Sequence, residues 1–190
     1  MLTVVSGGSA SGKSEFAESL GLAFSEWVLC ADGHAVPSCT QRFYLATMIP
    51  FDDECRARIQ KHRQMRAKKG FQTIEVPTDL QKVSFDAEPS QRIALLECMS
   101  NLVANEIFSE SGAGSQTFET ILEGMEHLLN QCSEVIVVTN ELFSDGVAYD
   151  EGTQDYLATL GKVNQALSAR ANRVYEVVAG IPICWKENLL

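Results

Sequence analysis

Long hydrophobic runs are missing from this sequence. No stretch approaches the roughly 18 consecutive apolar residues that a membrane-spanning helix needs, and the longest apolar runs are short ones such as Val135 to Val138. The amino-terminal segment Met1 to Val5 has neither the basic region nor the apolar length of a secretory signal peptide. We therefore expect a cytoplasmic protein without a membrane span.

Positive charge is also scarce. Fifteen Lys and Arg residues stand against 25 Asp and Glu residues, which gives a net charge of −10. A polyanion-binding protein with this balance would have to concentrate its few cations locally, so we expect no nucleic-acid partner. The 190 residues, 45% of them hydrophobic, suffice for one globular domain spanning 1–190.

Zinc-ligand spacings are absent as well. The six cysteines form no C-x-x-C pair and no ligand rhythm with the three histidines. They are Cys30, Cys39, Cys55, Cys98, Cys132 and Cys184. We interpret them as reduced thiols.

Short apolar runs alternate with segments of helical periodicity along the whole chain. Strands are expected at Leu2–Val5, Phe43–Thr47, Gln72–Val76, Ile93–Leu96, Val135–Thr139 and Arg173–Val178. Helices are expected at 13–24, at 52–69, from after Glu97 to about Phe108, at 118–130 and at 153–169. Loops are expected at 30–42, 109–116 and 143–152. This alternation predicts a three-layer α/β domain with a mostly parallel central sheet.

A phosphate-binding pattern follows the first expected strand. Residues Gly7, Gly8, Ser9, Ala10, Ser11, Gly12, Lys13 and Ser14 fit G-x-x-x-x-G-K-[ST] in full and lead into a helix. The glycines allow backbone N–H groups to surround a phosphate, and the helix adds its positive end. Lys13 would hold the β- and γ-phosphate oxygens, and the Ser14 hydroxyl would bind Mg²⁺. The pattern predicts binding of a nucleoside triphosphate.

A metal-orienting carboxylate is expected at the end of another strand. Two residues qualify: Glu97 after Ile93–Leu96, and Glu141 after Val135–Thr139. Either is also compatible with a solvated carboxylate where a strand emerges from the sheet, so the residues alone leave this choice open.

His62 lies in the charged stretch 52–69. Arg58 and Arg66 are one helical turn away on either side. Cationic neighbours favour neutral imidazole, which is the nucleophilic form. A solvated histidine on a basic helix is the alternative interpretation.

Taken together, these segments resemble the adenosylcobinamide kinase / adenosylcobinamide-phosphate guanylyltransferase family of cobalamin biosynthesis. The resemblance covers nearly the whole chain. It rests on the phosphate loop, Tyr44–Thr47 with Asp52–Glu54, Arg58-Ile59 with His62 and Arg66, Thr73 with Glu75, Leu95–Cys98, Val138–Glu141, Gly161–Gln165 and Gly180–Pro182.

The resemblance implies a P-loop NTPase fold of the RecA-like type, a homotrimer and a two-step transferase using GTP or ATP with Mg²⁺. The alcohol of adenosylcobinamide is phosphorylated first, and GMP then passes from GTP through a histidine to the new phosphate. By the same match His62 is the guanylylated residue, with Arg63 and Arg66 beside it. Thr47, Glu75 and Glu97 join the nucleotide-binding set, and Glu97 joins Ser14 as a metal ligand.

The chain also departs from the family pattern. Ala10 stands where the family often has arginine, and residues 142–158 differ from the usual continuation after Asn140-Glu141. Two alternatives therefore stay open. One is a P-loop small-molecule kinase without guanylyl transfer, and the other is a nucleotide-binding regulatory homologue.

Overall fold

The structure is a computed structural model of the chain. It describes residues 1–29, 35–37, 41–50, 60, 69–85, 92–142, 147 and 149–188. The expected helix at 52–69 therefore lies outside the described residues, apart from Gln60 and Lys69.

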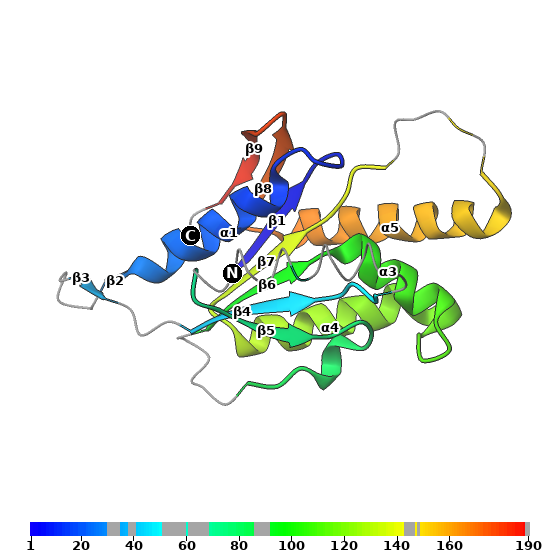
Figure 1. Cartoon of the computed structure of the whole chain (residues 1–190), viewed down its shortest axis with the longest axis horizontal. Helices are drawn as coiled ribbons and strands as arrows, with labels where there is room; N and C mark the ends of the chain where they lie inside the picture. Colours follow the sequence, from blue (N-terminus) through cyan, green and yellow to red (C-terminus); the bar gives the residue numbers. More distant parts are fainter. Residues whose placement is uncertain are drawn as a thin grey trace.

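A central sheet organises the described part of the chain (Figure 1). Its strand order is β5-β4-β6-β7-β1-β8-β9. The bounds are β1 (Leu2–Ser6), β4 (Gln41–Ala46), β5 (Phe71–Glu75), β6 (Arg92–Glu97), β7 (Glu134–Val138), β8 (Arg173–Val178) and β9 (Ile181–Glu187). All neighbouring pairs are parallel except β8 and β9, which form an antiparallel hairpin. The carboxyl ends of six strands therefore meet at one edge.

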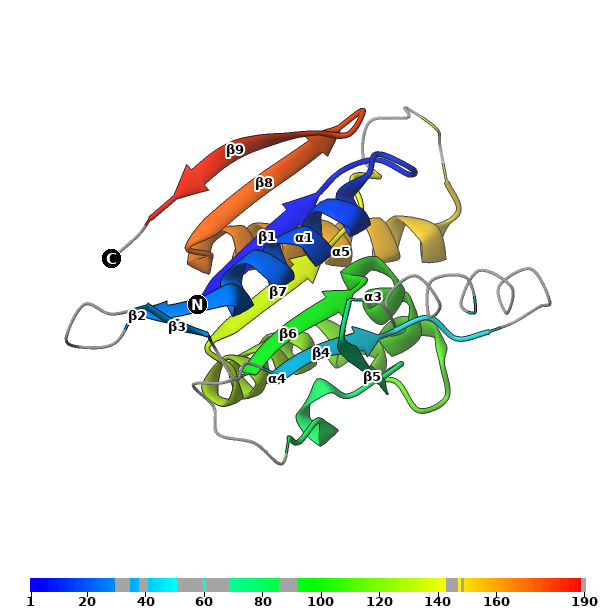
Figure 2. The same ribbon diagram turned by 60° about the vertical axis from the view of Figure 1, so that its left-hand side comes forward.

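Helices cover both faces of this sheet. Helix α1 (Lys13–Glu26) lies on one face, and α3 (Met99–Phe108), α4 (Thr117–Gln131) and α5 (Glu151–Arg170) lie on the other (Figure 2). Alternate residues of the central strands point into the two layers. Leu95 and Ile136 pack with the α1 side, whereas Leu96 and Val137 belong to the larger core under α3, α4 and α5. The expected three-layer α/β architecture is confirmed.

Short elements complete the described structure. The 3₁₀ turns are η1 (Leu80–Lys82) and η3 (Gly114–Gln116), and β2 (Trp27–Leu29) pairs with β3 (Ala35–Pro37) as a separate antiparallel hairpin. Among the described residues, no helix has both the length and the apolar composition of a membrane span.

Two of the expected loops end differently from the sequence prediction. The expected loop 30–42 contains β3 and the first two residues of β4. Helix α5 begins at Glu151 because the Asp150 side chain accepts a hydrogen bond from the Thr153 N–H at 3.0 Å. Within the expected loop 143–152, residues 143–146 and 148 lie outside the described residues.

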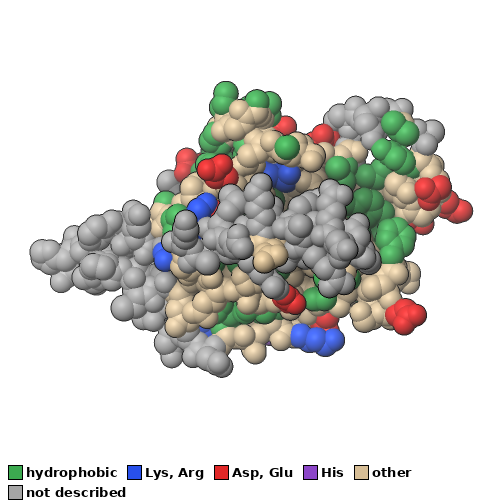
Figure 3. Space-filling view, in the orientation of Figure 1, with side chains coloured by type: hydrophobic (Ala, Val, Ile, Leu, Met, Phe, Trp, Pro, Cys, Tyr) green, Lys and Arg blue, Asp and Glu red, His purple; other side chains and the backbone are tan. Residues whose placement is uncertain are grey.

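Strand β9 is missing from the sequence prediction altogether. It lies at the sheet edge with almost every residue exposed, so it has no alternation of buried and exposed positions. Among its hydrophobic side chains, Ile181 and Trp185 are 66% and 68% exposed. Hydrophobic side chains are visible near the top of Figure 3, in the region where Figure 1 places the β8–β9 hairpin. Positive φ angles at Ala179 (50°) and Gly180 (80°) fit the two-residue turn that joins it to β8.

Candidate functional site

The phosphate loop joins β1 to α1 at the carboxyl edge of the sheet. Glycine is required at two of its positions. A Cβ on Gly7 would lie 2.6 Å from the Val177 carbonyl oxygen, and Gly12 has a φ of 92° with Gly180 against it. The Gly180 N–H also donates to the Ser11 carbonyl at 2.8 Å. The β8–β9 turn therefore supports the loop from behind.

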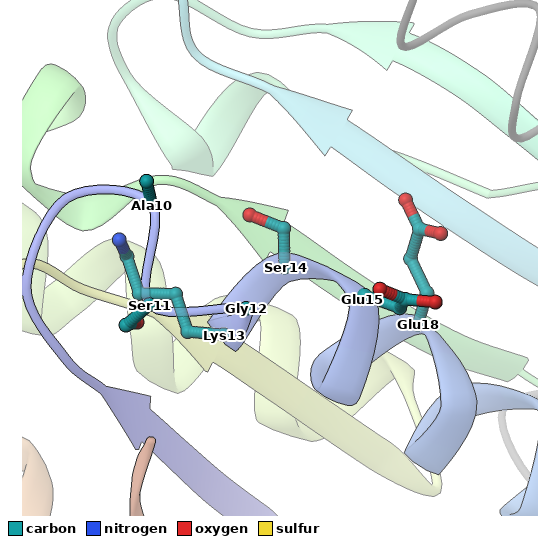
Figure 4. A pocket seen from close by; sticks show the side chains of 7 residues that line it. All are labelled: Ala10, Ser11, Gly12, Lys13, Ser14, Glu15 and Glu18. Carbon is teal, nitrogen blue, oxygen red and sulfur yellow. The ribbon is translucent and has the colours of Figure 1, made fainter. Parts of the chain in front are cut away.

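The Lys13 side chain folds back into the phosphate loop. The residue is 8% exposed, and its amine donates to the Gly8 carbonyl at 2.9 Å. Burial lowers the pKa of Lys13, while the nearby Glu97 carboxylate acts in the opposite direction. Figure 4 shows the Lys13 amine turned back toward Ala10. The positive charge of Lys13 therefore lies where an anionic ligand bound in the loop would neutralise it.

An open pocket runs along the loop and the start of α1 (Figure 4). Its lining residues are Ala10, Ser11, Gly12, Lys13, Ser14, Glu15 and Glu18. Six of them lie at or next to the positive end of the helix, which favours a phosphate there. The predicted phosphate site is therefore an accessible hollow.

Glu97 ends β6 directly beside the loop. The Ser14 hydroxyl donates to its Oε1 at 2.5 Å. Glu97 Oε2 is buried and has no hydrogen-bond partner among the described residues. Glu141, the other candidate, reaches the loop through its backbone, whose N–H donates to the Gly7 carbonyl at 3.1 Å. The structure thus brings the Glu97 carboxylate to the Ser14 hydroxyl.

This donor pair fits Mg²⁺. A hydroxyl and a carboxylate with an uncommitted oxygen are hard oxygen ligands of the kind that Mg²⁺ takes. Within the described residues, no group of three or more His, Cys, Asp or Glu side chains is placed to hold a metal. An ion at Ser14 and Glu97 would therefore need further oxygens from nucleotide phosphates and water.

A hydrogen-bonded cluster surrounds the residue after Glu97. The Thr47 hydroxyl bonds the backbone of Cys98, and the Cys98 thiol lies 3.2 Å from the Ser100 hydroxyl. Asn140 donates to that same hydroxyl at 2.7 Å. Burial raises the pKa of the Cys98 thiol, so the cluster contains a neutral thiol.

An ion pair between Glu18 and Lys69 also borders the pocket. The Lys69 amine lies 2.5 Å from Glu18 Oε2, and Glu18 is 4% exposed. This pair is missing from the sequence analysis, because nothing in either residue's local sequence indicates the partner. Helical spacing does place Glu18 one turn beyond Ser14 on α1, and this spacing could have indicated that Glu18 lies near the phosphate loop.

The other predicted site residues are placed less uniformly. Thr47 is fully buried behind Glu97, and Glu75 is an exposed residue at the end of β5, in register with Ala46. His62, Arg63 and Arg66 lie outside the described residues. The structure therefore brings together the phosphate loop, Glu97 and Thr47, and their roles stay predictions.

Strand, phosphate loop, helix and a carboxylate on a neighbouring strand define a P-loop nucleotide-binding protein of RecA-like fold. A solved structure of an ATPase domain has the same fold at 10% identity, with a TM-score of 0.51 and coverage of 92% of this chain and 68% of that one.

More specifically, the family described as "Cobinamide kinase / cobinamide phosphate guanyltransferase" matches residues 3–185. The chain is 32% identical to the bifunctional adenosylcobalamin biosynthesis protein CobU of Escherichia coli (strain K12), over 96% of this chain and 98% of that protein. It is 30% identical to the Salmonella typhimurium protein of the same name, with the same two coverages. The chain belongs to this family.

Proposed function

We propose that this chain is a bifunctional adenosylcobinamide kinase and adenosylcobinamide-phosphate guanylyltransferase, acting as a single domain over residues 1–190. Membership of the family supports this proposal. The observation that carries it is the contact between Ser14 of the phosphate loop and Glu97 of β6, because it unites the two parts of a nucleoside triphosphate site.

In the kinase step, the loop backbone from Gly7 to Gly12 binds the phosphates of ATP or GTP. Lys13 leaves its contact with the Gly8 carbonyl for the β- and γ-phosphate oxygens. The alcohol oxygen of adenosylcobinamide attacks the γ-phosphorus, the bond to the β-bridging oxygen breaks, and the alcohol proton is released. Ser14 and Glu97 would hold Mg²⁺, which supplies charge neutralisation on the phosphates when bound.

In the guanylyl step, an imidazole nitrogen of His62 attacks the α-phosphorus of GTP. An N–P bond forms, the bond from the α-phosphorus to the bridging oxygen breaks, and pyrophosphate leaves. The ring loses its remaining N–H proton. An oxygen of adenosylcobinamide phosphate then attacks the same phosphorus, the N–P bond breaks, and the ring takes back a proton, which restores the neutral imidazole. Arg63 and Arg66 would stabilise the developing phosphoryl charge, and Glu75 belongs to the nucleotide-binding set that the family resemblance implies.

The test is an intact-mass and pyrophosphate-release measurement with GTP and Mg²⁺, with and without adenosylcobinamide phosphate, on the wild type and His62→Ala. We expect a mass increase of one GMP on the wild type, lost when the acceptor is added and absent from His62→Ala. An adduct that survives in His62→Ala contradicts the assignment of the nucleophile.

The departures at 142–158 keep two other outcomes in view. Phosphoryl transfer to the alcohol without a GMP adduct would identify a kinase alone. Binding of GTP with neither transfer would identify a regulatory homologue.

Self-association is part of the same proposal. The resemblance implies a homotrimer, and the exposed hydrophobic side chains of the β8–β9 hairpin would supply apolar surface for contact between copies. Sedimentation of the wild type and of Ile181→Asp tests this: we expect a trimer for the first and a smaller species for the second. An unchanged trimer in Ile181→Asp would place the interface elsewhere.

A further inference from the structure

Thr47 uses every polar group that it has. Its hydroxyl accepts from the Cys98 N–H at 2.8 Å and donates to the Cys98 carbonyl at 2.9 Å. Its own N–H donates to the Glu97 carbonyl at 3.2 Å, and its carbonyl accepts from the Asn105 amide at 2.7 Å. The residue is 0% exposed. No group of Thr47 is free to contact a nucleotide in this arrangement.

The same stretch of β6 is held from its other side. The Cys98 thiol lies 3.2 Å from the Ser100 hydroxyl, which in turn accepts from the Asn140 amide at 2.7 Å. Thr47 follows β4 and Asn140 follows β7, and these strands are the two neighbours of β6. Cys98, the residue next to Glu97, is therefore held on the β4 side through its backbone by Thr47 and on the β7 side through its thiol by Ser100.

We propose that Thr47 is a positioning residue that fixes Glu97 for metal binding. Residues that orient a metal-binding side chain affect metal affinity, because a carboxylate that points elsewhere must first be ordered before it can bind the ion. Three hydrogen bonds from Thr47 reach Glu97 and Cys98, whereas the Glu97 side chain itself is bonded only to Ser14 among the described residues. The inference rests on the part of the proposed function that places Mg²⁺ at Ser14 and Glu97.

The test compares Thr47→Val with Thr47→Ser in the full chain. Valine keeps the shape and removes the hydroxyl, whereas serine retains the hydroxyl. Binding of Mn²⁺ as the probe ion is measured by electron paramagnetic resonance with a non-hydrolysable GTP analogue bound. GTP-analogue binding in EDTA is measured separately. Neither readout depends on turnover.

We expect Mn²⁺ affinity to fall roughly 10- to 100-fold in Thr47→Val, and to stay within about threefold of wild type in Thr47→Ser, which keeps the hydrogen-bonding group. Binding of the GTP analogue in EDTA should change less than about twofold in both variants, because Thr47 does not line the phosphate loop pocket. A split of this kind distinguishes positioning of a metal ligand from a general loss of structure.

Thr139→Val is the matched control. Thr139 is also a buried threonine at this sheet edge (1% exposed), but its hydroxyl donates to Asn164 of α5 at 2.8 Å. We expect this variant to lose stability as Thr47→Val does and to keep its Mn²⁺ affinity. Equal loss of metal affinity in both variants overturns the inference, as does wild-type affinity in Thr47→Val.

Two further variants keep the result decisive. If Thr47→Val does not fold, Ser100→Ala removes the support from the other side and should weaken Mn²⁺ binding roughly threefold or more; unchanged binding overturns the inference. Glu97→Gln reports on the proposed function itself. Wild-type Mn²⁺ affinity in Glu97→Gln means that the metal site is wrong. Loss there, with wild-type affinity in Thr47→Val, means that only the role of Thr47 is wrong.

Discussion

Glu97 and Glu134 lie on adjacent parallel strands, at opposite ends of these strands. Glu97 ends β6 at the carboxyl edge, and Glu134 begins β7 at the amino edge. Each has a buried Oε2 without a hydrogen-bond partner among the described residues. Their other oxygens differ. Glu134 Oε1 lies 3.2 Å from an Arg173 nitrogen, whereas Glu97 Oε1 accepts from the neutral hydroxyl of Ser14.

The two carboxylates therefore resemble each other in hydrogen-bond satisfaction and differ in charge compensation. At the amino edge the carboxylate has a full cationic partner, which itself lies over the Phe24 ring and is only 8% exposed. At the carboxyl edge the nearby cation, Lys13, is bonded to a backbone carbonyl and not to Glu97. A carboxylate without its own cation can take one from a ligand.

The largest expected effect follows from Glu97→Gln. The amide keeps an oxygen for the Ser14 hydroxyl but removes the negative charge, so nucleotide-dependent turnover should fall roughly 10²- to 10³-fold. The free energy of unfolding should change by less than about 1 kcal/mol, because the hydrogen bond is retained. Pyrophosphate release and urea unfolding measure the two quantities. Turnover within a few-fold of wild type would show that the charge at Glu97 is not used.

Glu134→Gln should produce the opposite pattern. It leaves the buried Arg173 cation without its carboxylate partner, and we expect a loss of about 3 kcal/mol in the free energy of unfolding. Phe24 and Glu187, which lies 4.0 Å from Arg173, limit the loss. Turnover per folded molecule should match wild type. The comparison fails if urea unfolding shows no loss, or if activity falls as it does in Glu97→Gln.

The sequence predicts the buried frame of this fold well. Val135–Val138 and Ile93–Leu96 are apolar on both faces because helices cover both, and a continuous apolar run is the signature of such strands. The edge strand β9 carries no such signature, since its side chains face outward on both sides. Burial creates the pattern on which sequence analysis relies, so exposed elements escape it.

The site divides in the same way. The phosphate loop is contiguous in sequence, and its backbone geometry is encoded by glycines at fixed spacing. The choice between Glu97 and Glu141 depends on contacts 83 residues apart, such as that of Glu97 with Ser14. The hydrogen bonds of Thr47 to Cys98 span 51 residues. Pairings of this kind are set by strand order, which local sequence does not specify.

A smaller effect should appear in the pH dependence of stability at the amino edge. Burial raises the pKa of the Cys132 thiol to about 11 from a usual value of 9.0. Between these values the folded chain holds a proton that the unfolded chain has lost, so stability falls as pH rises. At pH 10 the loss relative to pH 8 should be on the order of 1 kcal/mol.

Urea unfolding of the wild type and Cys132→Ala at pH 8 and pH 10 isolates this contribution. Other groups that titrate in this range are common to both proteins. We expect the wild type to lose more stability between the two pH values than Cys132→Ala does. Identical losses would show that the buried thiol does not titrate as described.

The smallest expected effect tests whether an unpartnered buried oxygen by itself marks function. Thr3 of β1 is 0% exposed, and its hydroxyl has no hydrogen-bond partner among the described residues, as is true of Oε2 in Glu97 and in Glu134. The Thr3 oxygen carries no charge, so there is nothing for a cation to compensate. Thr3→Val removes the desolvation cost and should raise the free energy of unfolding by about 1 kcal/mol without changing turnover. Urea unfolding and pyrophosphate release measure both. A fall in turnover would contradict this expectation. It would mean that a buried oxygen without a hydrogen-bond partner marks a functional position even when it carries no charge.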